Sequence, residues 1–171
     1  TSAVFQKYQK YQMTLFDNIN ISSSNNMKSE GELNEICKEA GVEMNSDNFP
    51  EGYDTMLSRE YNGIDLSGGQ WQRVAIARAL CRDHQFIIFD EPTSAIDPFE
   101  ETRIYNQFAQ IAENKTAIIV THRLGSVRLA DRIIVLKKGE VVQVGTHDEL
   151  LKVEGEYRRL FDSQKQWYDE K

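Results

Sequence analysis

The sequence predicts an α/β fold with a mainly parallel β-sheet, because apolar runs of two kinds alternate along the chain. Short continuous runs, typical of buried strands, lie at residues 86–89 and 116–120. Segments with apolar residues at helical spacing lie at residues 74–81 and 104–111. Strands that alternate with helices favour a parallel sheet covered by helices. With 171 residues, the chain is long enough for one domain with a sizeable core.

The overall composition excludes several classes of protein. The net charge of −7 argues against a nucleic-acid-binding surface, which needs clustered Lys and Arg. No apolar run approaches the roughly 20 residues that cross a bilayer, and no signal-peptide pattern opens the chain. Cys37 and Cys81 lie far apart in helical patterns, so we expect reduced, buried thiols and a cytosolic compartment. Without a CxxC or a His pair, the sequence does not indicate zinc.

The chain opens with a short apolar segment, residues 3–5, that is typical of the end of a strand. Gln6 follows directly, so the strand would deliver a polar side chain to a loop. Residues 7–12 alternate Lys, Tyr and Gln and are expected to form a solvated loop, with Tyr8 and Tyr11 as exposed aromatic residues. We therefore expect the chain to begin in the middle of a fold.

The first helix is predicted to begin after Ser29. Glu32 lies three residues later and completes a capping box, the local signal for a helix start. Gly41 is the expected end of this helix, because glycine tolerates the left-handed conformation found there. A loop rich in Asn, Asp, Pro and Gly follows at residues 45–54. The apolar face of the helix consists of Leu33, Ile36, Cys37 and Ala40.

Residues 66–70, Leu-Ser-Gly-Gly-Gln, are predicted to form a loop before a helix at residues 71–80. Gly68 and Gly69 would free the backbone for conformations that side chains forbid. Together with the Ser67 hydroxyl and the helix N-terminus, they supply the donors and the positive dipole end of a phosphate site. Taken alone, the Ser-Gly-Gly sequence fits a capped helix after a glycine turn better.

Asp90 and Glu91 come directly after the apolar run at residues 86–89. In open α/β sheets, ligands bind at the carboxyl ends of the strands. Adjacent carboxylates on a turn face different ways, so one can hold a hydrated Mg²⁺ while the other orients a water molecule. For an isolated Asp-Glu pair, two solvated loop acids are the simpler alternative.

The C-terminal half continues the α/β pattern. Asp97, with the proline after it, is a suitable N-cap for the next helix. The strand at residues 116–120 ends in Thr-His, which places His122 at its end. Two strands at residues 133–144 enclose a turn, and Thr146 begins another capping box. The expected apolar helix positions are Ile104, Phe108 and Ile111, then Tyr157, Leu160, Phe161 and Trp167.

Four of these segments resemble the motifs of ATP-binding-cassette (ABC) ATPases. Residues 66–80 resemble the signature motif, residues 86–98 the Walker B motif and D-loop, and residues 119–124 the H-loop. Gln6 matches the Q-loop. The resemblance implies the P-loop NTPase (ABC ATPase) fold: a RecA-like parallel sheet, here without its phosphate-loop strand, and a helical signature subdomain.

The same resemblance implies boundaries within a partial nucleotide-binding domain that spans residues 1–171. Residues from roughly 13 to 85 would form the helical signature subdomain. Residues 1–12 and 86–171 would form the remainder of the RecA-like core and the C-terminal helices.

By this resemblance, some residues act on the nucleotide bound by the same domain. Asp90 would help to position Mg²⁺, and Gln6 would touch the metal or the water. Glu91 would act as the general base that polarises the attacking water. His122 would contact the γ-phosphate of ATP and stabilise the charge that develops during transfer.

Other residues would act on ATP held by a second nucleotide-binding domain, because two-fold packing lets each face complete its neighbour's site. Asp97 would contact the partner near its phosphate-binding loop. The remaining groups of this set belong to the signature motif: Ser67, Gly68, Gly69 and Gln70.

The C-terminal segment 128–151 resembles exporter-type members, as does Tyr-Asp-Thr at residues 53–55. The function implied is ATP hydrolysis that drives export, at the cytoplasmic face of a membrane. The implied partners are a second nucleotide-binding domain and a transmembrane domain. Two alternatives stay open: an ABC-type ATPase of DNA repair or chromosome structure, and a non-catalytic module of the same fold.

No G-x-x-x-x-G-K-[ST] sequence occurs in the chain, so the phosphate cradle and its lysine are absent from it. We expect a C-terminal portion that alone neither binds ATP tightly nor hydrolyses it; a complete protein that never binds ATP is the alternative. By family topology the phosphate-loop strand lies between residues 116–120 and 133–136. Those strands should either pair directly or be covered by another chain, because unpaired edges are costly.

Overall fold

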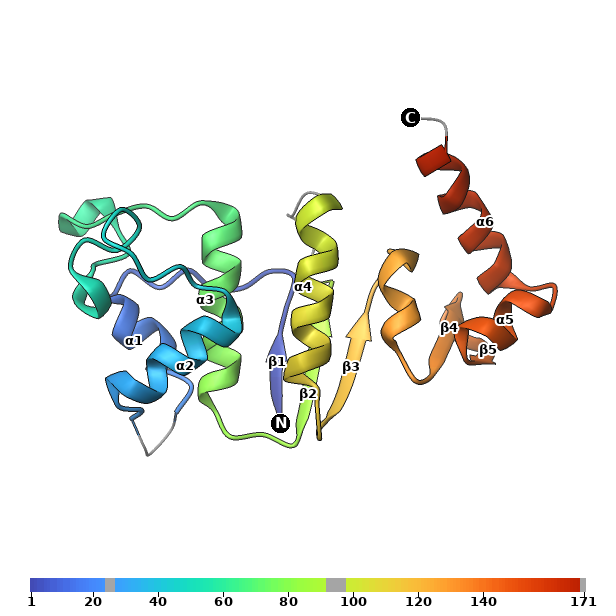
Figure 1. The fold of residues 1–171 in the computed structure, drawn as a ribbon, viewed down its shortest axis with the longest axis horizontal. Helices are drawn as coiled ribbons and strands as arrows, with labels where there is room; N and C mark the ends of the chain where they lie inside the picture. The colour runs from blue at the N-terminus through green and yellow to red at the C-terminus, as the bar shows by residue number, and fades with distance from the viewer. Residues whose placement is uncertain (24–26, 92–97, 170–171) are drawn as a thin grey trace. The chain divides into compact units, whose positions relative to one another are not determined.

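The computed structural model describes residues 1–23, 27–91 and 98–169 and divides into two compact units, Thr1–Val120 and Thr121–Lys171 (Figure 1). Each unit has its own apolar core. The two are described one after the other, beginning with the larger.

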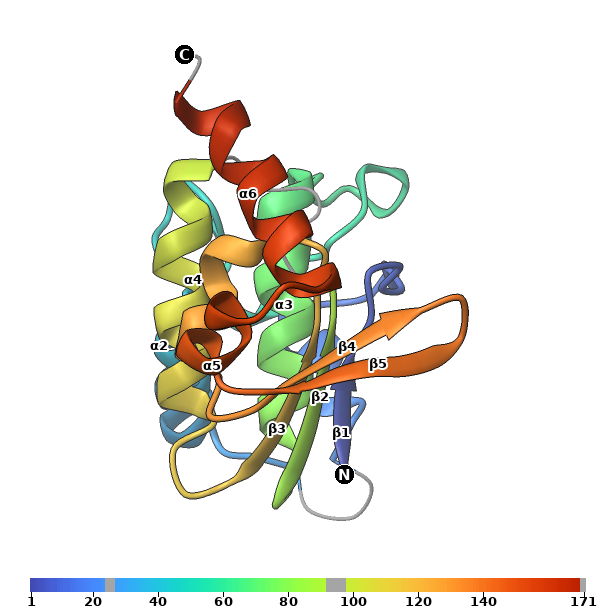
Figure 2. The same ribbon diagram turned by 90° about the vertical axis from the view of Figure 1, so that its right-hand side faces the viewer.

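A three-stranded parallel sheet forms the centre of the first unit, in the order β1-β2-β3 (Figure 2). The central strand is the most apolar, since Ile87 and Phe89 are completely buried. In the register of the sheet, Val4 lies opposite Phe89, and Phe89 opposite Ile119. The carboxyl ends of all three strands therefore meet at one edge. The strands are β1 (Ser2–Val4), β2 (Phe86–Asp90) and β3 (Thr116–Val120).

Helices cover this sheet and extend beyond it. Phe108 of α4 (Pro98–Ile111) stacks on Phe89 with 4.1 Å between ring centroids, which fixes α4 against β2. The 14-residue helix α3 contacts α1, α2 and β1, and eight of its residues are buried. The helices are α1 (Leu15–Asn20), α2 (Glu30–Ala40), α3 (Gly68–Cys81) and α4 (Pro98–Ile111), with short 3₁₀ turns at Gly52–Asp54 and Arg59–Tyr61.

The predicted helix at Ser29 is confirmed at both ends. Ser29 is the N-cap, both capping-box hydrogen bonds with Glu32 form, and Gly41 ends the helix in the left-handed conformation with φ 71°. The predicted start of α3 at Trp71 is wrong, because the helix begins at Gly68. The buried thiols are confirmed, since Cys37 and Cys81 are both free and buried.

The second unit packs two helices on one face of an antiparallel hairpin. Its core consists of Ile133 and Val135 from the hairpin with Leu150 and Tyr157 from the helices. The predicted hairpin, the helix capped at Thr146 and the final helix that carries Tyr157 and Phe161 are all confirmed. The elements are a 3₁₀ segment (Leu124–Leu129), β4 (Ile133–Lys137), β5 (Glu140–Gly145), α5 (His147–Lys152) and α6 (Glu156–Asp169).

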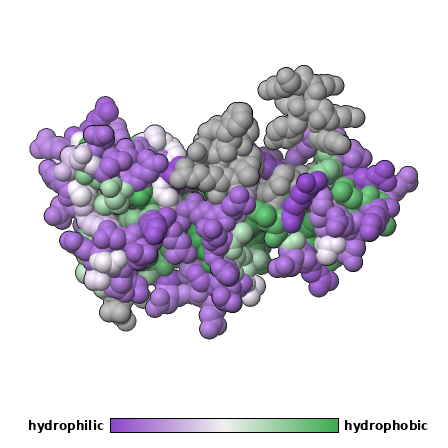
Figure 3. Space-filling model, in the orientation of Figure 1, coloured by the Kyte–Doolittle hydropathy of each residue, from purple (hydrophilic) through white to green (hydrophobic). Residues whose placement is uncertain are grey.

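The strands on either side of the expected gap belong to different units, β3 to the first and β4 to the second. Among the described residues, β3 pairs with β2 and β4 pairs with β5, in two separate sheets. Apolar side chains stay at the surface on both strands: Val120 is 48% exposed and Leu136 66%. Figure 3 shows apolar surface in both units. Direct pairing and cover by another segment both stay predictions. No helix in the described ranges is long and apolar enough to span a bilayer.

Candidate functional site

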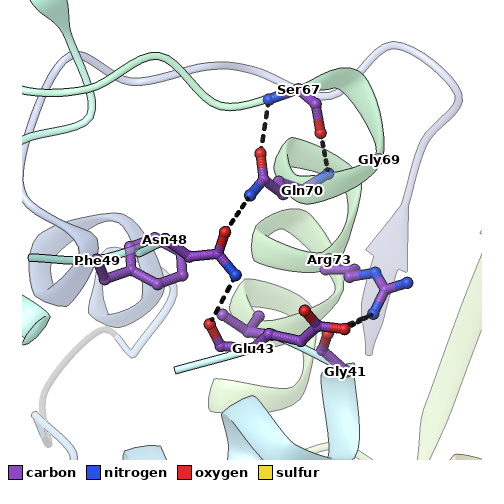
Figure 4. Close-up of a pocket in the computed structure, with 9 residues that line it drawn as sticks. Gly41, Glu43, Asn48, Phe49, Ser67, Gly69, Gln70 and Arg73 are labelled. Atoms are coloured by element: carbon purple, nitrogen blue, oxygen red, sulfur yellow. Dashed lines mark hydrogen bonds and ion pairs between the residues drawn. The ribbon is translucent and has the colours of Figure 1, made fainter. Parts of the chain in front are cut away.

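The first turn of α3 carries the predicted phosphate-binding residues. Ser67 is the N-cap, and its Oγ accepts a hydrogen bond from the backbone N–H of Gln70 at 3.3 Å. In return, the side-chain Oε1 of Gln70 accepts from the N–H of Ser67 at 2.8 Å (Figure 4). This reciprocal pair is a capping box built with an amide in place of the usual carboxylate. The first turn of α3 contains no acidic residue.

A polar loop holds the Gln70 side chain in this orientation. Its Nε2 donates to Oδ1 of Asn48 at 3.1 Å, and Nδ2 of Asn48 donates to the carbonyl of Glu43 at 3.3 Å (Figure 4). Sequence reasoning did not identify Asn48, because the contact spans 22 residues. The three residues border a cavity of about 200 Å³ that reaches the first turn of α3. Its other lining residues are Gly41, Val42, Phe49, Ser67, Gly69 and Arg73.

The two glycines of the motif are ordinary helical residues. Neither Gly68 nor Gly69 has a positive φ, so the expected unusual backbone conformation is wrong. A Cβ atom added to either would meet no atom within 4 Å. Gly63 shows the opposite case, since a Cβ there would lie 2.0 Å from the carbonyl oxygen of Met56. Packing within the described chain thus requires glycine at position 63 and does not require it at 68 or 69.

The segment after Gln6 contacts the same turn. The hydroxyl of Tyr8 donates to the carbonyl oxygen of Gly68 at 2.7 Å. Tyr8 is half-buried, and burial raises the pKa of its hydroxyl. The ring of Tyr11 lies under the Arg78 guanidinium, with 4.6 Å between the guanidinium carbon and the ring centroid. The prediction that Tyr8 and Tyr11 are merely exposed aromatic residues is therefore wrong.

Gln6, Asp90 and Glu91 follow parallel strands at one edge of the sheet. Gln6 comes two residues after Val4, which pairs with Phe89, and Asp90 comes directly after Phe89. The side chain of Gln6 is exposed, and that of Asp90 is half-buried. A carboxylate and an amide oxygen at one edge are hard oxygen donors of the kind that Mg²⁺ accepts together with phosphate oxygens. In the described ranges, no group of three or more His, Cys, Asp and Glu residues could hold a metal by itself.

Glu91 has a strained backbone conformation. Its φ is 45°, in the left-handed region that residues with a Cβ rarely adopt. Its N–H donates to the carbonyl of Val120 at 2.9 Å, so the end of β3 holds the residue in place. Such strain costs about 1–3 kcal/mol and is concentrated at functional positions.

Two predicted site residues, His122 and Asp97, fall outside the described part of the first unit. His122 is exposed and belongs to the second unit, where its carbonyl accepts a hydrogen bond from Nε2 of Gln164 at 2.5 Å. Glu91 belongs to the first unit, so a shared phosphate between Glu91 and His122 stays a prediction. Asp97 lies outside the described residues.

Comparison with known proteins shows the family to which this chain belongs. The ABC transporter family pattern matches residues 1–94. The chain belongs to the ABC transporter family. The subtilin transport ATP-binding protein SpaT of Bacillus subtilis is 38% identical over 164 residues, which cover 95% of this chain and 27% of that protein. An ATP-dependent lipid A-core flippase of Desulfotalea psychrophila is 40% identical over 145 residues, which cover 85% of this chain and 25% of that protein.

A solved structure extends the similarity to three dimensions. A bacterial Atm1-family ABC exporter with ATP bound superposes with a TM-score of 0.82 and 32% sequence identity, covering 96% of this chain and 28% of that one. The predicted ABC ATPase fold and the resemblance to exporters are thereby confirmed. This chain spans about a quarter of the length of these relatives.

Proposed function

We propose that this chain is the C-terminal part of the nucleotide-binding domain of an ABC exporter. In the longer protein it takes part in the binding and hydrolysis of ATP that drive export across a membrane. The observation that carries the proposal is the first turn of α3. Two helical glycines leave open space there, and no hydrogen bond within the described residues takes their backbone N–H groups.

The glycines weaken the helix that contains them. A glycine inside a helix costs about 0.5–1 kcal/mol relative to alanine. Since nothing in the described chain fills the space beside Gly68 and Gly69, their benefit comes from a group that approaches from outside. No hydrogen bond within the described residues takes the N–H groups of Gly68 and Gly69. Unpaired N–H groups at the start of a long helix bind phosphate.

The phosphate at this turn belongs to ATP held by a second nucleotide-binding domain. Ser67, Gly68, Gly69 and Gln70 contact it from one side, and Asp97 contacts the partner near its phosphate-binding loop. Each domain thus completes the site of the other, as isologous two-fold packing allows. ATP then links closure of the dimer to nucleotide occupancy. A transmembrane domain of the same transporter is the third component, which places this domain at the cytoplasmic face of the membrane.

The sheet edge serves the ATP bound by the same domain. Asp90 and Gln6 would hold Mg²⁺, which would neutralise phosphate charge when bound. Glu91 accepts a proton from the attacking water as general base, and its fixed backbone keeps the carboxylate near one position. His122 donates a hydrogen bond to the γ-phosphate as negative charge develops on it.

The phosphate cradle of this domain lies outside the chain. No G-x-x-x-x-G-K-[ST] sequence occurs in the 171 residues. Most of the binding energy for ATP comes from the amides and lysine of that loop. The isolated chain should therefore neither bind ATP tightly nor hydrolyse it.

The test uses the full-length gene product in membrane nanodiscs. Glu91→Gln should lower ATP turnover about 100-fold or more, because the amide cannot accept the proton. ATP binding, followed with a fluorescent nucleotide, should be retained. Lys115→Gln is the control, since half-buried Lys115 directly precedes β3, at the opposite end of that strand from the Val120 carbonyl that holds Glu91, and should leave turnover unchanged. Normal turnover in the Glu91 variant would refute the assigned role.

A further inference from the structure

We propose that Tyr8 is a positioning residue for phosphate binding: its hydroxyl orients the peptide group that presents the N–H of Gly69. The inference rests on the proposed function, because it concerns the same turn of α3. The observation that carries it is the hydrogen bond from the Tyr8 hydroxyl to the Gly68 carbonyl, 2.7 Å long.

The Gly68 carbonyl and the Gly69 N–H belong to one peptide group. The peptide bond is planar and trans, so the two groups point in opposite directions from the same rigid plane. A hydrogen bond that fixes the oxygen therefore fixes the direction of the N–H. It also polarises the peptide, which strengthens the N–H as a donor. The oxygen has two lone pairs, so it can accept from Tyr8 as well as from the N–H one helical turn later.

No side chain of its own restrains this peptide. It joins two glycines, which lose more conformational freedom on folding than any other residue. The capping box ties down Ser67 before it and Gln70 after it, but neither of its hydrogen bonds touches the peptide between Gly68 and Gly69. Tyr8 supplies a further restraint from a segment 60 residues away.

Tyr8 is itself held in place. It packs against the apolar core of the first unit, and Nη1 of Arg78 donates to the carbonyl of Gln9, the next residue, at 3.1 Å. Arg78 is anchored in turn, since its Nε and Nη2 each donate to Asn18 at 2.9 Å. The segment after Gln6 is thus fixed to α3 both at its first turn and near its end. A positioning residue needs its own side chain to be held in place in this way.

The test replaces only the hydroxyl in the full-length transporter. Tyr8→Phe should raise the ATP concentration for half-maximal turnover about 3- to 10-fold, the effect of one oriented hydrogen bond. The thermal unfolding midpoint should stay the same, because the ring keeps its packing. Tyr11→Phe is the matched control: its ring makes the contact with Arg78, so half-saturation should be unchanged.

A second background shows whether Tyr8 acts through Gly69. Gly69→Ala fills the space where the phosphate approaches, so Tyr8→Phe should add little in that background. Additive effects of the two changes would overturn the proposal. So would an unchanged half-saturation in Tyr8→Phe, or a loss of turnover that only follows a lower unfolding midpoint.

Failure of the proposed function would look different. Ser67→Ala and Gly69→Ala, assayed beside Tyr8→Phe, would then leave both turnover and half-saturation at the wild-type values. If these two variants are impaired and Tyr8→Phe is not, the proposed function stands and the role of Tyr8 is refuted.

Discussion

Helices α2 and α3 both begin with a capping box, but the side chain that completes the box is charged in α2 and neutral in α3. In α2 the N-cap Ser29 pairs with Glu32, and in α3 the N-cap Ser67 pairs with Gln70. The first turn of α2 contains two acidic residues, and that of α3 contains none. Carboxylates in the first turn neutralise the positive end of the helix dipole from within the chain. In α3 the uncharged amide of Gln70 accepts the hydrogen bond from the N-cap N–H but does not neutralise the dipole. The positive end of this helix is therefore left for an anion from outside the chain.

Helix α5 supports this interpretation. It begins with a third capping box, between Thr146 and Glu149, and again the third residue is a glutamate. Hydrogen bonds from the backbone and side chain of Thr146 lower the pKa of Glu149, so the carboxylate stays ionised. We assign no ligand to the two helices with a carboxylate in the box. The helix with an amide is the one to which we assign phosphate binding.

Exchange of the two residues is the strongest way to break the comparison. Gln70→Glu should keep the capping box and place a negative charge beside the phosphate of the partner's ATP. Repulsion between the carboxylate introduced at position 70 and the phosphate should lower turnover by roughly 30-fold or more. Glu32→Gln, the reverse exchange on α2, should leave turnover unchanged. Steady-state ATPase assays of the full-length protein decide this, and equal effects of the two exchanges would contradict the comparison.

A pair of glycines sharpens the same comparison. Gly31 in α2 and Gly69 in α3 are both helical, and a Cβ at either would meet no atom within 4 Å. Alanine should therefore stabilise each helix by about 0.5–1 kcal/mol. The effect on ATP turnover should differ between the two variants. Gly69→Ala should lower turnover roughly 10-fold, because the added methyl group displaces a hydrogen-bonded phosphate. Gly31→Ala should leave turnover unchanged.

Hydrogen exchange of the two helices and ATPase assays measure the two effects separately. If Gly31→Ala lowered turnover as much as Gly69→Ala, the space beside Gly69 would have no special role.

The smallest expected effect is a difference between the starts of α2 and α3 in how their amide hydrogen exchange depends on pH. Hydrogen bonds from the backbone N–H and the hydroxyl of Ser29 lower the pKa of Glu32 from 4.5, with a smaller contribution from Lys28. A lowered carboxyl pKa adds stability that is complete above pH 4.5 and is lost as the pH falls through the folded-state value. The start of α2 should therefore exchange its amide protons faster below pH 4.5, relative to Glu32→Gln. The start of α3 should show no such difference, because Gln70 does not titrate.

The sequence predicted those parts of the fold whose signals are local. Ser29, Glu32 and Gly41 are all the information needed to place α2, and the structure confirms them. The start of α3 was misplaced because two adjacent glycines are typical of a turn, although Ser67 and Gln70 have the spacing of a capping box. Helix α1 was missed because six residues are too few to show a helical period.

The candidate site divides in the same way. The motif residues could be identified from their order along the chain. Their supports could not, because Tyr8 reaches Gly68 across 60 residues and Asn48 reaches Gln70 across 22. Such contacts depend on how the loops pack against α3, which no local pattern encodes. The strained φ of Glu91 is likewise set by the end of β3, through the carbonyl of Val120.

The two buried cysteines have a practical consequence for spectroscopy. Cys37 and Cys81 are inaccessible, and burial raises the pKa of both thiols, so each is rarely a thiolate at neutral pH. The thiolate is the nucleophile that attacks maleimide and methanethiosulfonate reagents. A single cysteine introduced at exposed Glu140 or Lys7 would therefore accept a spin label or a fluorophore while the native pair stays unlabelled. In the full-length protein, distances between labels on two copies of the domain would test the proposed approach of the domains as ATP is added.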